Sequence, residues 1–248
     1  MQRYFINPDQ VSDGQIEIYG DDIHHVKNVM RLSAGDCIIC CDGEGIDYRV
    51  RIQQVEDHRI LCRIEERFLS EGEPKLRITV AQSLPKREKM EWVIQKGTEL
   101  GADRFQPFTS ARTVVKLDGK KASKRRERWR RIAKEAAEQA HRGRIPVVEP
   151  LLDWNGLLQS FTAYDRVFFA YEKGGHPLKE VAKFPSDASL LLVIGPEGGF
   201  PESEAEEAKA AGAVSIHLGP RILRAETAPL ALLACLLYSN GEMGGEPL

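Results

Sequence analysis

The sequence has no long apolar run. Its longest apolar stretches, such as residues 190–194 and 230–237, fall well short of the roughly 20 residues that span a bilayer. The first ten residues, MQRYFINPDQ, lack the basic and apolar segments of a secretory signal. The sequence therefore predicts a cytoplasmic protein with no membrane partner.

The sequence also lacks two common glycine motifs for nucleotides. Neither the dinucleotide fingerprint G-x-G-x-x-G nor the P-loop G-x-x-x-x-G-K-[ST] occurs in it. In both motifs, backbone amides at a helix N-terminus bind phosphate groups. A nicotinamide-dependent enzyme or an NTPase is therefore disfavoured.

Cysteine is sparse, with five residues, and four of them lie in strand-like apolar runs where a thiol packs as a small hydrophobe. The odd number argues against a disulfide framework. Cys37-x-x-Cys40 has no second Cys or His pair at zinc-finger spacing. We therefore expect neither disulfides nor a metal site.

The charge is unevenly distributed, although the net charge is only −2. Residues 112–144 contain 13 Lys or Arg and 4 Asp or Glu. Such a concentration is expected of a phosphate-binding face. It is equally expected of a solvated helix face, and composition alone leaves both interpretations open.

The first part of the chain is rich in strand-like segments separated by Asp-Gly, Glu-Gly and Asp-His turns. The predicted strands are residues 16–19, 37–42, 46–55 and 59–68, with one helix at about 21–31. This pattern predicts a small barrel. The polar sequence Glu71-Gly72-Glu73-Pro74 predicts a linker after it.

Beyond this linker, short apolar runs alternate with helical patterns. The predicted strands are residues 78–84, 105–108, 167–171, 190–194 and 215–218. This alternation is typical of a parallel sheet with helices on both faces. Ser203 and Glu206 have the spacing of a capping box, and Thr227 begins a last helix that is apolar nearly all round. We expect that helix to be buried, in the core or against a second subunit.

A glycine-rich loop follows the predicted strand at residues 190–194. The segment Leu190-Leu-Leu-Val-Ile-Gly-Pro-Glu-Gly-Gly-Phe200 ends the strand in glycines, and ligands of open parallel sheets bind beyond the carboxyl ends of strands. Gly195, Gly198 and Gly199 permit close backbone approach, and Glu197 adds a carboxylate. The alternative is a tight strand-to-helix turn with no ligand.

A second loop, His217-Leu-Gly-Pro-Arg-Ile-Leu-Arg-Ala-Glu-Thr-Ala228, joins a buried strand to a buried helix. It nevertheless contains Arg221, Arg224 and Glu226, which need polar partners or a ligand because unpaired buried charges are costly. The alternative to a ligand site is an Arg224–Glu226 pair within the loop.

These two loops together resemble the signature pair of the SPOUT superfamily of methyltransferases. The sequence is most similar to the ribosomal RNA small subunit methyltransferase E family, which methylates N3 of a uridine in bacterial 16S ribosomal RNA. The resemblance covers the whole chain. Weaker similarities are Arg3-Tyr-Phe, His24-His-Val, Arg31 and Gly35-Asp36 in the first part, and Glu99-Leu-Gly-Ala, Ser110-Ala-Arg112 and Glu138-Gln-Ala-His-Arg142 in the middle.

The resemblance implies a PUA-like RNA-binding domain at residues 1–72 and a SPOUT methyltransferase domain at residues 76–248. The second is an α/β domain with a parallel sheet and a deep trefoil knot, a rare exception to the rule that chains do not thread loops. It also implies a homodimer, with the last helix at the interface. The implied partner is 16S ribosomal RNA, within the assembling or assembled small ribosomal subunit.

The implied cofactor is S-adenosylmethionine. Its expected binding residues are Tyr171, Ile194, Gly195, Pro196, Glu197, Gly198, Gly199, Leu218, Gly219, Ile222, Leu223, Arg224, Thr227 and Ala228. The expected RNA-binding residues are Arg3, Arg31, Arg112, Arg125, Arg126, Arg130 and Arg142. A solvated position is the alternative for Arg112 and Arg142.

The chemistry of this implied reaction requires an activated nucleophile. Uracil N3 carries a proton, so the enzyme needs a base or a cation that stabilises the uracil anion. Arg224 is the expected cation, while Glu226 or Glu197 is either the base or a group that orients an arginine or caps a backbone amide. Two other functions stay open: methylation of a ribose 2′-hydroxyl or of guanine by the same fold, and non-catalytic RNA binding during ribosome assembly.

Overall fold

The structure, a computed structural model, describes residues 1–244. The chain forms two compact units, which we call unit 1 and unit 2. Unit 1 comprises Met1–Glu73 and Ala137–Ile145, and unit 2 comprises Pro74–Ala136 and Pro146–Leu248. Within residues 1–244, no helix is long and apolar enough to cross a membrane.

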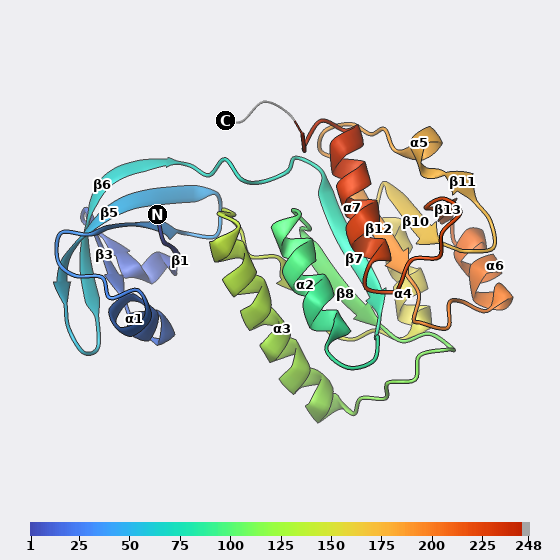
Figure 1. Cartoon of the computed structure of the whole chain (residues 1–248), viewed down its shortest axis with the longest axis horizontal. Coiled ribbons are helices and arrows are strands. Elements are labelled where there is room, and N and C mark those ends of the chain that lie inside the picture. Colours follow the sequence, from blue (N-terminus) through green and yellow to red (C-terminus); the bar gives the residue numbers. More distant parts are fainter. Residues whose placement is uncertain (245–248) are drawn as a thin grey trace. The chain divides into compact units, whose positions relative to one another are not determined.

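Unit 1 contains a six-stranded sheet with the order β1-β4-β5-β6-β3-β2 (Figure 1). Only β1 and β4 are parallel; the other neighbours are antiparallel. The strands are β1 Arg3–Phe5, β2 Val11–Ser12, β3 Gln15–Ile18, β4 Cys37–Cys41, β5 Ile46–Val55 and β6 Ile60–Leu69. The β-rich character expected from the sequence is confirmed, although the described strands form a sheet with two ends rather than a closed barrel.

Alternation of side chains along β5 explains how unit 1 forms its core. Tyr48, Val50 and Ile52 are buried, whereas Arg49 and Arg51 are exposed on the other face. The predicted helix at 21–31 is observed as α1 Asp21–His24, continued by a π-helical turn, η2 His25–Val29. One further short turn is the 3₁₀-helix η1 Pro8–Gln10.

The segment Ala137–Ile145 closes unit 1 through polar contacts. Arg142 is buried, and its Nη2 atom lies 2.7 Å from Glu73 Oε2. Gly143 N donates to Glu73 Oε1 at 3.0 Å. Arg3 Nη1 donates to the Arg142 carbonyl oxygen at 3.3 Å and to Asp47 Oδ2 at 2.7 Å. A segment distant in sequence therefore completes unit 1 by satisfying buried charges.

Unit 2 contains a seven-stranded sheet with the order β11-β13-β10-β12-β7-β8-β9, and all its paired strands are parallel. The strands are β7 Arg77–Ser83, β8 Arg104–Phe108, β9 Val147–Val148, β10 Arg166–Ala170, β11 His176–Pro177, β12 Ser189–Ile194 and β13 Val214–His217. The predicted α/β class with a parallel sheet is confirmed. The trefoil knot stays a prediction.

Helices cover both faces of this sheet. They are α2 Lys89–Glu99, α3 Gly119–Gln139, α4 Trp154–Ser160, the 3₁₀-helix η3 Phe161–Ala163, α5 Leu178–Val181, α6 Glu202–Ala210 and α7 Ala228–Ser239. Side chains from α4 and α6 share a core with alternate residues of β10 and β12, such as Phe169 and Leu191. On the other face, α7 contacts β7, β12 and α2.

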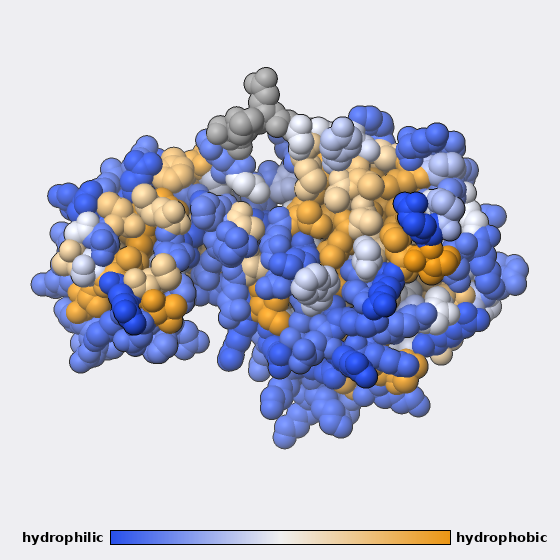
Figure 2. Space-filling model, in the orientation of Figure 1, coloured by the Kyte–Doolittle hydropathy of each residue, from blue (hydrophilic) through white to orange (hydrophobic). Residues whose placement is uncertain are grey.

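The last helix, α7, is apolar on both its inner and outer sides. Leu232, Leu233, Leu236 and Leu237 are buried, and burying such a side chain contributes about 1.5–3 kcal/mol. The outward surface over α7 is also largely apolar (Figure 2). The expected burial in the core is confirmed for one side of the helix only, because Cys235 is exposed.

The expected start of α6 is wrong. The helix begins at Glu202, with Pro201 as its N-cap residue and no side-chain capping bond, so Ser203 caps nothing. The helix ends at a glycine in the left-handed region. Gly212 has φ +96°, and the amides of Gly212 and Ala213 donate to the carbonyls of Lys209 and Ala208, which is a Schellman motif.

Candidate functional site

A pocket of about 610 Å³ lies in unit 2, where β10, β12 and β13 end. This volume is in the range of small-molecule sites. Both glycine loops contribute to it, as expected for loops at the carboxyl edge of a parallel sheet. The lining residues are Lys89, Ala170, Tyr171, Glu172, Ile194, Gly195, Pro196, Glu197, Gly198, Gly199, Phe200, Ile216, His217, Leu218, Gly219, Pro220, Arg221, Ile222, Leu223, Arg224, Ala225 and Ala228.

Glycine is required at two positions of the first loop. A Cβ atom at Gly195 would lie 2.9 Å from the Phe200 ring. Gly199 has φ +64°, and its Cβ atom would lie 2.8 Å from Glu172 Oε1. At Gly198 the nearest atom is Arg112 Cδ, at 3.6 Å, which is an ordinary contact. Gly198 therefore lines the pocket at a position where the fold tolerates a Cβ atom.

One lysine joins the two candidate carboxylates. Lys89 Nζ lies 3.2 Å from Glu197 Oε1 and 3.1 Å from Glu226 Oε2. Glu197 Oε1 also accepts a hydrogen bond from Lys86 N at 3.0 Å. Glu226 does not form the ion pair with Arg224 that was the alternative to a ligand site. We call these three side chains the Lys89–Glu197–Glu226 cluster.

Sequence reasoning missed Lys89. The signal was present, because Lys86-Arg87-Glu88-Lys89 follows the buried strand β7 at the same carboxyl edge of the sheet as the glycine loops. Without the strand order, however, nothing in the sequence brings residue 89 close to residues 197 and 226.

Glu197 and Lys89 are both held in their charged forms. Burial opposes ionisation of Glu197, but hydrogen bonds from backbone amides, including Lys86, and the Lys89 ammonium outweigh it and hold the pKa of Glu197 below its ordinary value. Glu226, and then Glu197, raise the pKa of Lys89 above its ordinary value. Glu197 and Lys89 therefore form an ion pair at the pocket.

Arg224 is exposed and lines the pocket. Within residues 1–244, its guanidinium group forms no hydrogen bond or ion pair, so it is available to a ligand. Thr227 differs from the other expected cofactor residues, because it is the N-cap residue of α7 and is not among those that line the pocket.

Arg112 braces the first glycine loop. Its Nη1 atom donates to the carbonyl oxygen of Gly198 at 2.8 Å and to that of Phe200 at 3.4 Å. The preceding residue is fixed as well, since Ala111 N donates to Glu204 Oε1 at 2.7 Å. Burial raises the pKa of Glu204, and the hydrogen bond from Ala111 only partly opposes this.

The expected RNA-binding arginines fall into two groups. Arg3 and Arg142 depart from the expectation, since their side chains are only 10% and 4% exposed and form ion pairs within unit 1. A phosphate contact there would require breaking these pairs. Arg31 and Arg130 are exposed, and Arg125 and Arg126 are half-buried.

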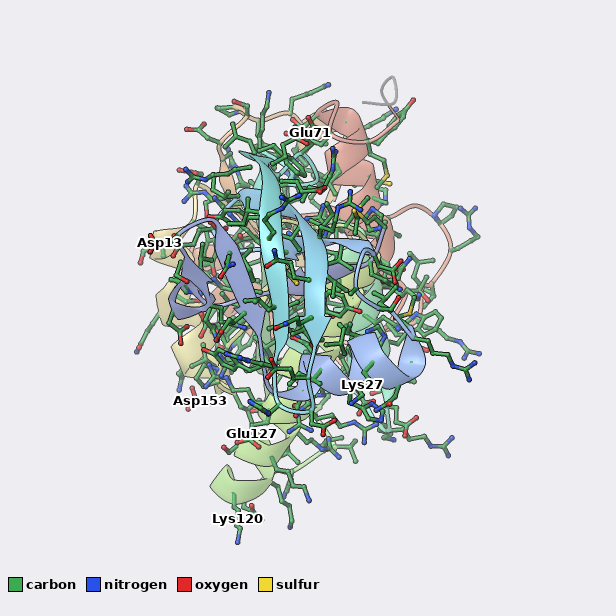
Figure 3. All side chains as sticks on the ribbon, turned by 90° about the vertical axis from the view of Figure 1, so that its left-hand side faces the viewer. Asp13, Lys27, Glu71, Lys120, Glu127 and Asp153 are labelled. Carbon is green, nitrogen blue, oxygen red and sulfur yellow. The ribbon has the colours of Figure 1, made fainter. Side chains whose placement is uncertain are left out.

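The exposed basic side chains of unit 2 concentrate on α3. Lys120 and Glu127 point away from the ribbon of this helix (Figure 3). Arg126 is less available to RNA, because its Nε atom donates a hydrogen bond to the Val148 carbonyl oxygen at 2.8 Å. The helix therefore offers a basic surface with Lys120, Arg125 and Arg130 among its members.

The fold and the pocket define an α/β domain that binds a small ligand between glycine loops at the carboxyl edge of a parallel sheet. Known families agree with this class. A family described as RNA methyltransferase domain matches residues 72–237, and one described as RNA methyltransferase PUA domain matches residues 18–65.

Individual relatives match along the whole chain. Ribosomal RNA small subunit methyltransferase E of Bacillus subtilis is 43% identical over 259 aligned positions, covering 99% of this chain and 100% of that protein. The Mycobacterium tuberculosis protein of the same name is 34% identical, with 88% and 84% covered. The crystal structure of the Neisseria gonorrhoeae protein of that name, bound to S-adenosylmethionine, has a TM-score of 0.87 at 30% identity, with 97% and 98% covered. The chain belongs to the ribosomal RNA small subunit methyltransferase E family.

Proposed function

We propose that this protein transfers a methyl group from S-adenosylmethionine to N3 of a specific uridine in 16S ribosomal RNA. The observation that carries the proposal is the pocket between the two glycine loops, where Arg224 is free and the Lys89–Glu197–Glu226 cluster is charged. Membership of the family, with 43% identity to a full-length relative, supports the same activity.

The residues present fit S-adenosylmethionine. The pocket of about 610 Å³ suits a ligand of this size. Gly198 lines the pocket without a side chain, which permits close backbone approach, and the carboxylates of Glu172 and Glu197 in the lining attract a cationic sulfonium. When bound, this cofactor supplies an electrophilic methyl group and leaves as a neutral thioether. We assign its binding to the pocket-lining residues expected from the sequence and treat Thr227 as a support for α7.

The side chains around the pocket have separate tasks in this proposal. A carboxylate accepts the N3 proton of uracil, which turns a poor nucleophile into an anion. Arg224 stabilises the negative charge that develops on the uracil carbonyl oxygens. Arg112 keeps the Gly198 and Phe200 carbonyls in place, and this maintains the shape of the first glycine loop.

The RNA contacts are proposed for basic residues that are exposed or half-buried and form no ion pair within the described residues 1–244. Arg125 and Arg130 on α3, together with Arg31 in unit 1, are suited to phosphate groups because phosphate contacts position RNA without reading its sequence. The unit that matches a PUA domain supports a further role of unit 1 in RNA recognition.

We further propose a homodimer that acts in the cytoplasm on RNA of the small ribosomal subunit. The outer side of α7 supports the dimer, because it is apolar and includes the exposed Tyr238 and Cys235 (Figure 2). The substrate is either the assembling or the assembled subunit.

Nucleoside analysis tests this function. Small-subunit RNA from cells that lack the protein is incubated with purified protein and S-adenosylmethionine, digested and analysed by mass spectrometry. We expect 3-methyluridine to appear. A 2′-O-methylated nucleoside or a methylguanosine instead would overturn the proposed specificity. Binding of RNA without binding of cofactor, measured by calorimetry, would indicate an assembly factor.

A further inference from the structure

Lys89 occupies a position that its own helix does not favour. It is the first residue of α2, where the helix dipole repels a cation. Its ammonium nevertheless lies within 3.2 Å of one carboxylate from each of the two loops around the pocket. The placement is therefore explained by the site rather than by the helix.

The two carboxylates do not depend equally on this lysine. Glu197 Oε1 keeps the Lys86 backbone amide as a second donor. Glu226 Oε2 is shielded from solvent and has no aligned hydrogen bond within residues 1–244, so the Lys89 ammonium is its only favourable contact there. Without Lys89, this buried oxygen would favour its protonated form.

Other charged and titratable groups around the pocket do not replace Lys89. Glu172 and Glu197 also line the pocket, but they are acidic and cannot take the place of an ammonium group. Arg221 and Arg224 lie on the same loop as Glu226 but form no ion pair with it within residues 1–244. His217 also lines the pocket, and its Nδ1 atom accepts a hydrogen bond from Gly219 N at 3.3 Å.

From this geometry we propose that Lys89, which lines the pocket, is a positioning residue that keeps Glu226 ionised beside the pocket wall, and that Glu226 is the base that accepts the uracil N3 proton. In that step the N3–H bond breaks, its electron pair stays on N3, and the proton moves to the Glu226 carboxylate to give a neutral acid. Glu197, with its second donor, anchors the glycine loop and does not take the proton. The inference rests on the proposed function and refines it.

The ionisation of Glu226 is measured first, without cofactor or RNA. The side-chain carboxyl signal of ¹³C-labelled glutamate is titrated by NMR and assigned by its loss in Glu226→Gln. We expect Lys89→Met to move the Glu226 titration upward by about one pH unit or more, since an opposite charge within hydrogen-bonding distance is removed. Lys89→Arg restores it. Lys86→Met is the matched control, because Lys86 is exposed and contributes only its backbone amide.

Single-turnover methylation at saturating cofactor and RNA is then followed across a pH series. We expect the rate of Lys89→Met to fall off at a higher pH than that of the wild type, displaced by the same interval as the Glu226 titration, and to recover as pH rises because Glu226 then ionises. The rate of Glu226→Gln should not recover in this way as pH rises. The double variant is no slower than Glu226→Gln alone, because the two residues act through one group.

Several results would overturn the inference. An unmoved Glu226 titration in folded Lys89→Met refutes it whatever the enzyme methylates. If Lys89→Met loses rate equally at every pH, or loses only cofactor affinity, then Lys89 merely holds the two loops together. If the wild type makes no 3-methyluridine, the proposed function fails, and the NMR titration still decides the role of Lys89.

Discussion

Arg142 and Glu73 form a buried ion pair, with Nη2 and Oε2 2.7 Å apart, at the end of the most basic stretch of the sequence. Their side chains are 4% and 19% exposed. The pair joins two segments of unit 1 that lie far apart in the chain. It shows that a basic stretch can contain a residue that serves the fold rather than a nucleic acid.

Replacing Arg142 should destabilise the protein. We expect Arg142→Leu to lower the free energy of unfolding by about 3 kcal/mol, because it leaves the Glu73 carboxylate buried without its partner. Urea denaturation followed by circular dichroism measures this. Arg130→Leu, at an exposed position of α3, should stay within about 0.5 kcal/mol of the wild type. Equal stability of the two variants would contradict the assignment.

A side chain at Gly198 should exclude the cofactor without unfolding the protein. The nearest atom to a Cβ there is 3.6 Å away, so the fold accommodates it. We expect Gly198→Val to lose S-adenosylmethionine binding in calorimetry, with a melting temperature close to that of the wild type. Gly119→Val is the control, because a Cβ at Gly119 meets open space at the start of α3. Normal cofactor affinity in folded Gly198→Val would reject the pocket.

The basic surface of α3 should determine the salt dependence of RNA binding. We expect charge reversal at Lys120, Arg125 and Arg130 to weaken binding and to flatten the plot of log affinity against log salt, by about 0.7–0.9 for each RNA phosphate that the protein no longer neutralises. Fluorescence anisotropy between low and physiological salt measures the slope. Arg126 is left intact because it supports Val148.

The control for this experiment lies at the opposite edge of the sheet. Arg166 is exposed and begins β10, so it lies at the amino edge, away from the pocket. Arg166→Glu should leave the slope unchanged. If the triple variant and the wild type give the same slope, α3 is only a solvated helix.

Arg224 should matter chiefly for turnover. We expect Arg224→Ala to bind cofactor and RNA nearly normally and to lose about 100-fold in single-turnover rate, because one preorganised stabilising group is removed. Higher pH should partly rescue it, since hydroxide then assists deprotonation of N3. Arg221→Ala, the neighbouring arginine of the same loop, should lose much less. A defect confined to cofactor affinity would make Arg224 a binding residue.

Glu197 should contribute to stability only where it is ionised. Its pKa is lowered in the folded protein, so its contribution is present above the ordinary value of 4.5 and is lost as pH falls through the lower folded value. We expect Glu197→Gln to be less stable than the wild type at pH 7 and the difference to vanish in acid. Thermal unfolding across pH 3–7 measures this, and a difference that does not depend on pH would contradict the charge assignment.

The elements themselves were largely predictable from local patterns. The predicted strands at 46–55 and 190–194 correspond closely to β5 and β12. A half-buried strand such as β5 alternates apolar and polar residues, whereas a fully buried strand such as β12 is a continuous apolar run. The start of α6 was mispredicted, since Pro201 precedes the helix and no side chain caps it. The glycine loops were recognisable because strand ends and glycines mark ligand edges in parallel sheets.

The sequence by itself determined the α/β class of unit 2, the β-rich character of unit 1 and the two loops that border the pocket. Only the tertiary structure decided that Arg142 pairs with Glu73 and that Lys89, rather than Arg224, pairs with Glu226. The physical reason is that periodicity and turn chemistry act over a few residues, whereas the partner of a buried charge depends on strand order. The order β12-β7 puts the loop after residue 83 beside the loop after residue 194, and no local signal encodes that neighbourhood.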